Sequence, residues 1–456
     1  MLNERRRLLR SPLLRGVSTV AIANVLFLLL VLFGQGDRCI SLDRVRTAFA
    51  AGELRTRDFL WNDARRGWFQ FDDCNALQML INPDPSRLDR ALAPKVYQEN
   101  EDWEGQCRVL RFLVEEWVDP QKLFAMRYSR YWHGYNVIAG LGLELVELRD
   151  LRRLLSAGVW ISMALFALAS WRSGPRVRRT GLIIAVAAAT VWAVPYFAPG
   201  LTQGPGDALL FLALAGVAAW PRMTSDPRVL VPYAAGFGAA AVFLEMLTGK
   251  LPTAIAWLAA MTLAAARDER PAGERAPRAV VIALTAFVFG ALATVAAKLI
   301  LARVLSEPEA GSAFAARLAQ YLKVPEYGDF GPSWVPPSFA KLPGILLPFA
   351  RLFYKSPMLT YGKVRAGYLL AAAGGLAWLA AVVSGWRERR TERGRDRLLI
   401  AGAALVPAVW VCLLPTHTYI HATFMVRMLV VPITLGPIAL LWPREPRSAP
   451  ASVSAR

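Results

Sequence analysis

The sequence predicts an all-α polytopic membrane protein with about ten transmembrane helices, and three observations support this fold class. Apolar residues make up 55% of the 456 residues, and the mean hydropathy of +0.34 is high for a soluble enzyme. Several stretches of about 17–25 residues carry almost no charge, which is the length of a helix that crosses a bilayer. Arginines gather in short segments between these stretches. Backbone groups in lipid need internal hydrogen bonds, so the stretches are expected to be helices.

Ten segments fit a membrane span. They are residues 16–34, 154–171, 180–197, 206–220, 229–247, 251–266, 278–302, 364–386, 398–414 and 424–442. Basic clusters lie at 5–15, 172–179, 222–228, 267–278, 387–397 and 444–456, whereas the short loops 198–206 and 248–250 carry one lysine between them. By the positive-inside rule, this alternation places both termini in the cytoplasm. The first span is read as an uncleaved helix and not as a signal peptide, because its apolar stretch is long.

The net charge of +19 has the same explanation. The basic residues are spread over short loops and form no basic face on a polar domain. A nucleic-acid partner is therefore not expected, and membrane lipids are the expected surroundings.

The spans divide the chain into five parts with two long loops on one face. The parts are 1–34 (basic cytoplasmic N-terminus and first helix), 35–153 (extracytoplasmic loop with an acidic pair and an amphipathic helix), 154–302 (helices 2–7), 303–363 (second extracytoplasmic loop) and 364–456 (helices 8–10 and basic cytoplasmic tail). Because the non-membrane residues are concentrated on that face, we expect chemistry or recognition there.

Three of the four cysteines, Cys39, Cys74 and Cys107, lie in the first long loop. An extracytoplasmic compartment permits disulfides, but three cysteines leave one over, so the pairing stays open. We favour Cys74–Cys107, which would close a loop around the acidic pair. No C-x-x-C pair exists, so a thiolate zinc site is not expected.

The acidic pair is Asp72 and Asp73 in "FQFDDCNAL", at the start of a short helix expected at 74–81. Adjacent carboxylates that share a site raise one another's pKa, which suits a general base. A bound Mg²⁺ or Mn²⁺ could neutralise the pair, although no metal site is otherwise indicated. The alternative is a helix cap with a solvated acid. The amphipathic helix is expected at 141–153, with Leu141, Leu145 and Leu148 on its apolar face.

Candidate substrate-binding residues lie at or near the same outer level. They are Arg427, His417, His421, His133, Arg130, Lys298, Glu245, Lys363 and Arg365. An intramembrane arginine such as Arg427 is costly and usually faces the protein interior with a partner, and arginine suits phosphate. His417 and His421 are four residues apart and would share one helix face. Anchoring at the membrane interface is the alternative for the histidines, and helix capping is the alternative for Glu245.

With a long loop after the first span, a second between spans seven and eight, and "DDCNAL" in the first loop, the chain resembles the GT-C superfamily of membrane glycosyltransferases. The segments "RYWHGY", "FLEMLTGK" and "HTYIHATFMVR" are similar to those of bacterial multispan proteins associated with envelope glycosylation. The resemblance implies a base in the first loop, here Asp72 or Asp73. It also implies basic donor-phosphate contacts near the membrane surface, here Arg427 and its neighbours. The family's acid usually follows the first span closely, so Asp37 and Asp63 remain rivals.

The function expected from this resemblance is inverting transfer of a sugar from a polyprenyl-phosphate donor to an envelope glycan, lipid or protein, outside the cytoplasmic membrane of a bacterium. A transporter or flippase of lipid-linked glycans is the first alternative. An O-antigen-ligase-like enzyme and a non-catalytic envelope-assembly protein are the others.

Overall fold

The computed structural model describes residues 11–36, 42–56, 70–81, 86–98, 105–116, 123–191, 194–244, 249–269, 275–326, 342–354 and 366–443. This part of the chain is mostly helical, as predicted. Its one sheet is an antiparallel pair in the first long loop, in which Val96 of β1 (Lys95–Gln98) faces Met126 of β2 (Phe124–Arg127).

Five segments of the described chain are long and apolar enough to cross a membrane, which is consistent with a multi-pass membrane protein. They are Pro12–Gly34 within α2 (Pro12–Gly36), α8 (Leu148–Arg172), α12 (Pro227–Leu244), α14 (Arg275–Leu305), and Glu392–Leu413, which comprises α18 (Glu392–Ala403) and α19 (Val406–Leu413). Each contains an 18-residue window that is strongly apolar and carries at most two charged residues, which is a length close to what a bilayer requires.

Helices also lie at the other five predicted segments. They are α9 (Pro175–Thr190) with α10 (Val194–Phe197), α11 (Gly204–Ala219), α13 (Lys250–Glu269), α17 (Ala366–Arg387) and α22 (Val430–Leu440). Between α11 and α12 lies the short helix η2 (Pro221–Ser225). Whether these five segments cross a membrane remains a prediction.

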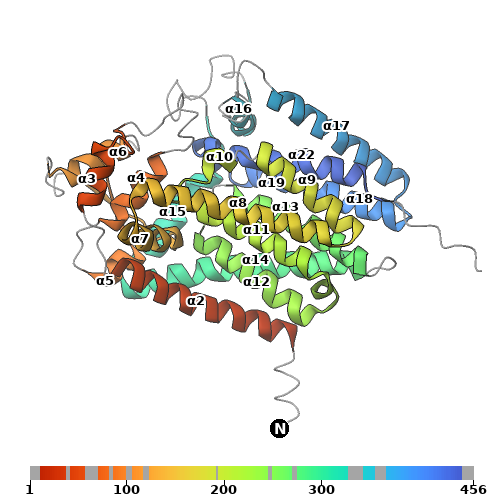
Figure 1. Cartoon of the computed structure of the whole chain (residues 1–456), viewed down its shortest axis with the longest axis horizontal. Helices are drawn as coiled ribbons and strands as arrows, with labels where there is room; N and C mark the ends of the chain where they lie inside the picture. Colours follow the sequence, from red (N-terminus) through yellow and green to blue (C-terminus); the bar gives the residue numbers. More distant parts are fainter. Residues whose placement is uncertain are drawn as a thin grey trace, which may run out of the picture.

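The first long loop folds over one end of the helix bundle (Figure 1). Its helices are α3 (Leu42–Ala50), α4 (Gln70–Leu80), α5 (Arg87–Leu92), α6 (Gln106–Val114) and α7 (Gly134–Leu145), and α15 (Ala310–Leu322) of the second loop lies at the same end. The remaining short elements are η4 (Gly344–Leu346), α16 (Leu347–Tyr354), α20 (Pro415–Ile420), α21 (Ala422–Met425) and η6 (Val426–Leu429). The elements that carry the predicted acids are thereby fixed at one end of the bundle.

Two apolar cores hold these parts together. The large core fills the bundle, and a smaller one under the first loop packs Leu77 and Leu110 against Leu151 of α8. A disulfide between Cys74 and Cys107 joins α4 to α6 within the smaller core, which confirms the favoured pairing. Cys39 lies outside the described residues.

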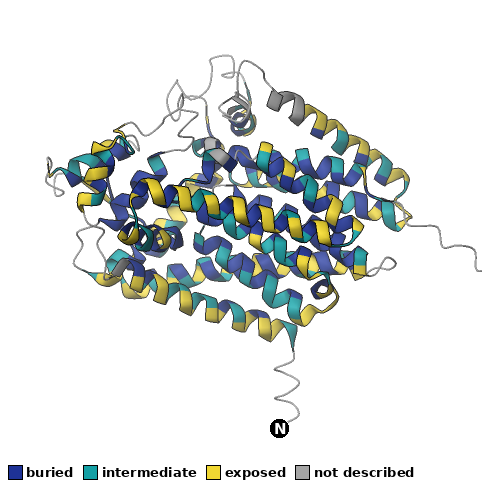
Figure 2. Ribbon diagram, in the orientation of Figure 1, coloured by how far each residue is buried: buried dark blue, intermediate teal, exposed yellow. Residues whose placement is uncertain are grey.

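Large apolar side chains are exposed along the outer faces of the long helices (Figure 2). Ile22 of α2 and Ile161 of α8 are each 60% exposed, and Leu292 of α14 is 65% exposed. In water such faces would promote aggregation, whereas in hydrocarbon they are solvated by lipid chains. The exposure pattern therefore agrees with a lipid-embedded bundle.

α12 packs closely against α14, and two glycines make this approach possible. A Cβ at Gly238 would collide with the carbonyl of Phe287, and a Cβ at Gly290 would collide with that of Ala235. Small residues at crossing points allow helices in membranes to approach closely and gain packing energy.

Two local expectations were wrong, and a third segment is a span with an internal break. The helix predicted at 141–153 breaks at Val146, whose backbone is extended, so Leu145 is 82% exposed while Leu148 is buried in the next helix. The helix that carries the acids begins at Gln70, so both lie in its first turn and not at its cap. The predicted span 398–414 largely coincides with the apolar segment Glu392–Leu413, although the helix is interrupted at Ala404–Leu405, just before Pro407, which cannot donate a helical hydrogen bond.

Candidate active site

The two adjacent acids of α4 have different partners. Asp73 is fully enclosed, and its Oδ2 accepts a hydrogen bond from Arg152 Nη2 at 2.8 Å while its Oδ1 accepts one from the Leu201 amide at 2.8 Å. Burial raises the pKa of Asp73, and the charge and hydrogen bond of Arg152 oppose that rise. Asp73 therefore ties α4 to α8 and to the loop before α11.

Asp72 has a weaker set of partners. It is buried, and its Oδ2 accepts a hydrogen bond from Gln203 Nε2 at 3.2 Å. Burial raises the pKa of Asp72 to about 7 and the charge of Asp73 adds to the rise, while the Gln203 hydrogen bond and the charges of Lys250 and Arg427 oppose it. A carboxylate with a pKa near neutrality is suited to proton transfer.

A buried cluster of two cations and one acid lies beside Asp72. Arg427 Nη1 contacts Asp207 Oδ1 at 2.8 Å, and Lys250 Nζ lies 3.7 Å from the same oxygen. Lys250 also donates to the Gln203 carbonyl at 2.9 Å, so one residue, Gln203, connects the cluster to Asp72. Both cations influence the pKa of Asp72, which places the predicted acid and the predicted Arg427 in one electrostatic site.

The segment 198–207 builds this cluster through its local sequence. Gly204, Pro205 and Gly206 open α11, and Asp207 occupies its first turn, where a negative charge is favourable. A Cβ at Gly206 would lie 2.5 Å from Lys250 Nζ, so the glycine leaves the space through which Lys250 reaches Asp207. Phe197 lies under Arg427, with the guanidinium carbon 3.6 Å from the ring centroid.

The charge of Asp72 also acts on Tyr135, which forms a pair with His133. Burial raises the pKa of Tyr135 well above its ordinary value, and the charge of Asp72 is the next cause. The Tyr135 hydroxyl lies 2.8 Å from His133 Nδ1, while His133 Nε2 lies 2.8 Å from the Tyr128 carbonyl oxygen. Burial lowers the pKa of His133 to about 3, with the charge of Lys298 adding to the effect, so the ring is neutral. A neutral His133 donates to the Tyr128 carbonyl and accepts from Tyr135, and thereby orients that tyrosine.

Arg130 belongs to an aromatic cluster next to His133. Its guanidinium carbon lies 4.3 Å from the Tyr128 ring centroid and 5.5 Å from that of Tyr131. The side chains of Tyr131 and Tyr321 are hydrogen-bonded, which joins the first loop to α15. Arg130 thus lies among aromatic side chains of the first loop and α15, and its contact with substrate stays a prediction.

His417 and His421 adjoin the same aromatic cluster. The ring centroids of the two histidines lie 4.7 Å apart, and that of His417 is 4.4 Å from Tyr321. The predicted proximity is confirmed, although α20 ends at Ile420 and His421 lies at the break, so the two histidines do not share a continuous helix.

Lys298 has a separate environment. Its amine donates to the Leu92 carbonyl at 2.6 Å and lies 5.5 Å from the centroid of the Trp132 ring. These contacts join α14 to α5 and to the start of α7. The structure does not bring Lys298 into contact with the Asp207 cluster, and its electrostatic effect at the site falls on His133.

Three predicted substrate-binding residues, Glu245, Lys363 and Arg365, lie outside the described residues. So do Asp37 and Asp63, the rival acids. Their roles stay predictions.

A divalent cation finds no prepared ligand set at the acidic pair. Both Asp73 oxygens accept hydrogen bonds from the protein, and Asp72 points to Gln203 instead of sharing a partner with Asp73. Within the described ranges, no group of three or more His, Cys, Asp or Glu side chains is arranged to hold a metal. Mg²⁺ or Mn²⁺ therefore enters no step below.

Sequence reasoning missed Asp207, Gln203 and Tyr135, and it considered Lys250 only as a loop residue and as an alternative partner of Glu245. Asp207 could have been found, because an acid inside a predicted span needs a partner by the same rule that selected Arg427. Gln203 and Tyr135 carried no comparable signal, since polar uncharged residues near a membrane surface are common.

Comparison with protein-family models, curated proteins and solved structures gave no match to this chain.

Proposed function

We propose that this protein is an integral membrane glycosyltransferase that moves a sugar from a polyprenyl-phosphate donor to a hydroxyl of an envelope glycan, lipid or protein. One observation carries the proposal: a buried carboxylate with a pKa of about 7, Asp72, lies within the electrostatic reach of two buried cations, Lys250 and Arg427. A base and a phosphate-binding pair in one site match what such a transfer requires.

In the proposed reaction, Asp72 acts on the acceptor, and Arg427 and Lys250 act on the donor phosphate. Asp72 takes the proton of the acceptor hydroxyl. The acceptor oxygen attacks the anomeric carbon of the donor sugar from the face opposite the phosphate. The bond between that carbon and the phosphate oxygen breaks, which inverts the anomeric configuration and releases the polyprenyl phosphate. Arg427 and Lys250 stabilise the charge that develops on the leaving phosphate.

Asp207 fits this scheme as the partner that the cations hold before the donor arrives. It is fully buried, and its Oδ2 has no hydrogen-bond partner within the described part of the chain. A donor phosphate can then share Arg427 and Lys250 with Asp207 without leaving a buried acid unpaired. Tyr135, held by His133, orients polar groups near Asp72.

In this proposal the chain crosses a bacterial cytoplasmic membrane ten times, and both termini are cytoplasmic. The GT-C-like arrangement then places Asp72 and the cluster at the extracytoplasmic face. The positive-inside pattern of the arginine-rich loops and the position of the first loop at one end of the bundle support this orientation. Arg130, His417 and His421, between the two long loops, would contact the sugar or acceptor.

A transporter of lipid-linked glycans is the second candidate, and a different observation favours it. Arg427 lies in η6, a short 3-10 turn that interrupts the α-helical pattern between α21 and α22, and it pairs with a buried acid. Broken helices and buried ionisable residues are typical of secondary transporters. Transfer in detergent separates the two candidates, because transport requires a closed membrane and transfer does not.

The decisive experiment is Asp72→Asn in the purified protein, assayed in detergent with a panel of synthetic short-chain polyprenyl-phosphate sugars. Release of the polyprenyl phosphate should fall about 10²–10⁴-fold, the usual contribution of a general base. Asp150→Asn is the matched control, since Asp150 is exposed and pairs only with Arg153 within the described contacts. Its rate should equal that of the wild type.

Unchanged release in Asp72→Asn would reject Asp72 as the base. Release by neither protein with any donor in the panel, combined with glycan movement in sealed vesicles, would favour the transporter.

A further inference from the structure

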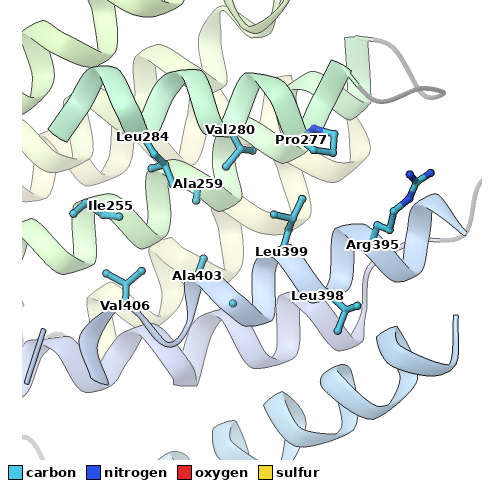
Figure 3. A pocket seen from close by; sticks show the side chains of 11 residues that line it. Ile255, Ala259, Pro277, Val280, Leu284, Arg395, Leu398, Leu399, Ala403 and Val406 are labelled. Carbon is cyan, nitrogen blue, oxygen red and sulfur yellow. The ribbon is translucent and has the colours of Figure 1, made fainter. Parts of the chain in front are cut away.

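An apolar groove of about 750 Å³ lies between α13, α14 and the α18–α19 segment (Figure 3). Its size falls in the range of ligand-binding pockets. Eleven described residues line it, and Arg395 is the one charged residue among them. Ala259 and Val280 form part of its buried floor.

The polarity of the groove changes along its length. In Figure 3 Arg395 lies at one end, and Leu399, Ala403 and Val406 follow along the same wall toward the other end. Arg395, Leu399 and Ala403 follow one another at four-residue intervals on one face of α18, and Val406 is the first residue of α19. The eleven steps from Arg395 to Val406 correspond to roughly 16 Å at 1.5 Å per residue. The lining therefore matches a molecule with an anionic head and an extended apolar tail.

The groove opens on the surface that the bundle presents to lipid. Gly402 lines it and is exposed, and a Cβ at this position would meet no atom within 4 Å. Two of the helices that form it, α14 and the α18–α19 segment, are long and apolar enough to cross a membrane. Apolar cavities stay dry, so a hydrocarbon chain from the bilayer is the physical filler of this space.

The charged end of the groove lies on the side with the most arginines. Arg395 belongs to the basic run 387–397, and the basic cluster 267–278 flanks the start of α14, where Pro277 lines the groove. The positive-inside rule makes this side cytoplasmic, where anionic lipids and basic pockets between helices attract one another.

We propose that this groove binds one acyl chain of an anionic phospholipid of the cytoplasmic leaflet, with the lipid phosphate next to Arg395. The argument for this site does not rest on the proposed glycosyl transfer, and Arg395 takes no part in it. The bound lipid would hold α14 and the α18–α19 segment at a fixed separation.

The experiment is native mass spectrometry of the purified full-length protein in detergent, with equal amounts of phosphatidylglycerol and phosphatidylcholine added. Wild-type protein should retain phosphatidylglycerol about fivefold over phosphatidylcholine, as expected for one arginine near a lipid phosphate. Arg395→Gln should abolish this preference and leave retention of phosphatidylcholine unchanged.

Gly402→Leu should reduce retention of both lipids, because the new side chain occupies the groove. Gly158→Leu in α8 is its matched control, since a Cβ at Gly158 also meets no atom within 4 Å and Gly158 does not line the groove. Ala403→Leu replaces Gly402→Leu if the latter elutes as aggregate.

If Gly402→Leu and Ala403→Leu both retained the two lipids as the wild type does, the proposed lipid site would be rejected. Equal retention of the two phospholipids by the wild type would overturn the role of Arg395. Stronger retention of an isoprenoid phosphate than of phosphatidylglycerol would overturn the choice of a phospholipid.

Discussion

Each end of the helix bundle buries an arginine, and the two arginines are bound in different ways. At the arginine-rich end, Arg267 makes two 2.8 Å contacts to the two oxygens of Asp396 and a third 2.8 Å contact to Glu392, and Trp442 donates to Asp396 at 3.2 Å. At the other end, the contact between Arg427 and Asp207 is to a single oxygen, Oδ1, which Lys250 approaches only to 3.7 Å.

The difference separates a structural ion pair from one that can exchange partners. The Arg267 pair is bidentate, it joins α13 to α18, and both Asp396 oxygens are used. In the Asp207 cluster, two cations share one oxygen while the other oxygen has no hydrogen-bond partner within the described ranges. Burying such an incomplete arrangement is costly without a ligand, which is why we assign the site to this end.

The largest effect is expected from Arg267→Gln, which tests the structural half of the comparison. The variant leaves Asp396 buried without its cation, and removing one partner of a buried pair costs about 3–5 kcal/mol. The free energy of unfolding, or the thermal midpoint in detergent, should fall accordingly. A thermal unfolding midpoint within about a degree of that of the wild type would show that the Arg267–Asp396 pair does not stabilise the fold.

Arg427→Gln tests the other half and should act mainly on activity. Loss of one group that stabilises developing charge lowers the transfer rate about 10²–10³-fold. The unfolding midpoint should fall less than in Arg267→Gln, because Lys250 remains beside Asp207. The measurement is polyprenyl-phosphate release together with thermal unfolding. A larger loss of stability than in Arg267→Gln, with activity retained, would reverse the assignment.

The smallest effect is the response to pH, which concerns Asp72. Only the ionised carboxylate acts as a base, so release should fall about tenfold per pH unit below pH 7. The folded-state pKa of about 7 lies above the ordinary 3.8, so the folded protein binds this proton more tightly than the unfolded chain. The resulting stability is present below about pH 4 and is lost as pH rises through 7. The rate of polyprenyl-phosphate release and the unfolding midpoint, both measured between pH 5 and 8, test the two predicted pH dependences.

Asp72→Asn is the control for this profile, since it removes the titrating group. Its residual rate should lack the tenfold slope. An identical pH profile in wild type and variant would assign the titration to another group.

The helices of the bundle were predictable because hydropathy and arginine placement are local signals. The breaks within them were harder to place. The interruption before Pro407 has a sequence cause, whereas the break at Val146 depends on how α7 and α8 pack against the first loop. A short apolar segment alone does not determine where a helix bends.

The candidate site was predictable in its residue types but not in its pairings. The sequence pointed to the acidic pair and to Arg427, yet it could not distinguish Asp72 from Asp73. The distinction depends on Arg152 and Leu201, which are 79 and 128 residues away from Asp73. Lys298 shows the same limit, because its partner is a backbone carbonyl 206 residues away that no side-chain pattern reveals.

The covalent link between α4 and α6 has a consequence for biogenesis. In the proposed orientation, thiols of a newly made chain stay reduced in the cytosol, and the bond between Cys74 and Cys107 would form only once the loop has been exported to an oxidising compartment. The turn that carries Asp72 would then acquire its final anchorage only after export. A chain inserted in the opposite orientation would leave this loop in the cytosol with both thiols reduced. Formation of the disulfide would therefore distinguish correctly oriented chains from inverted ones.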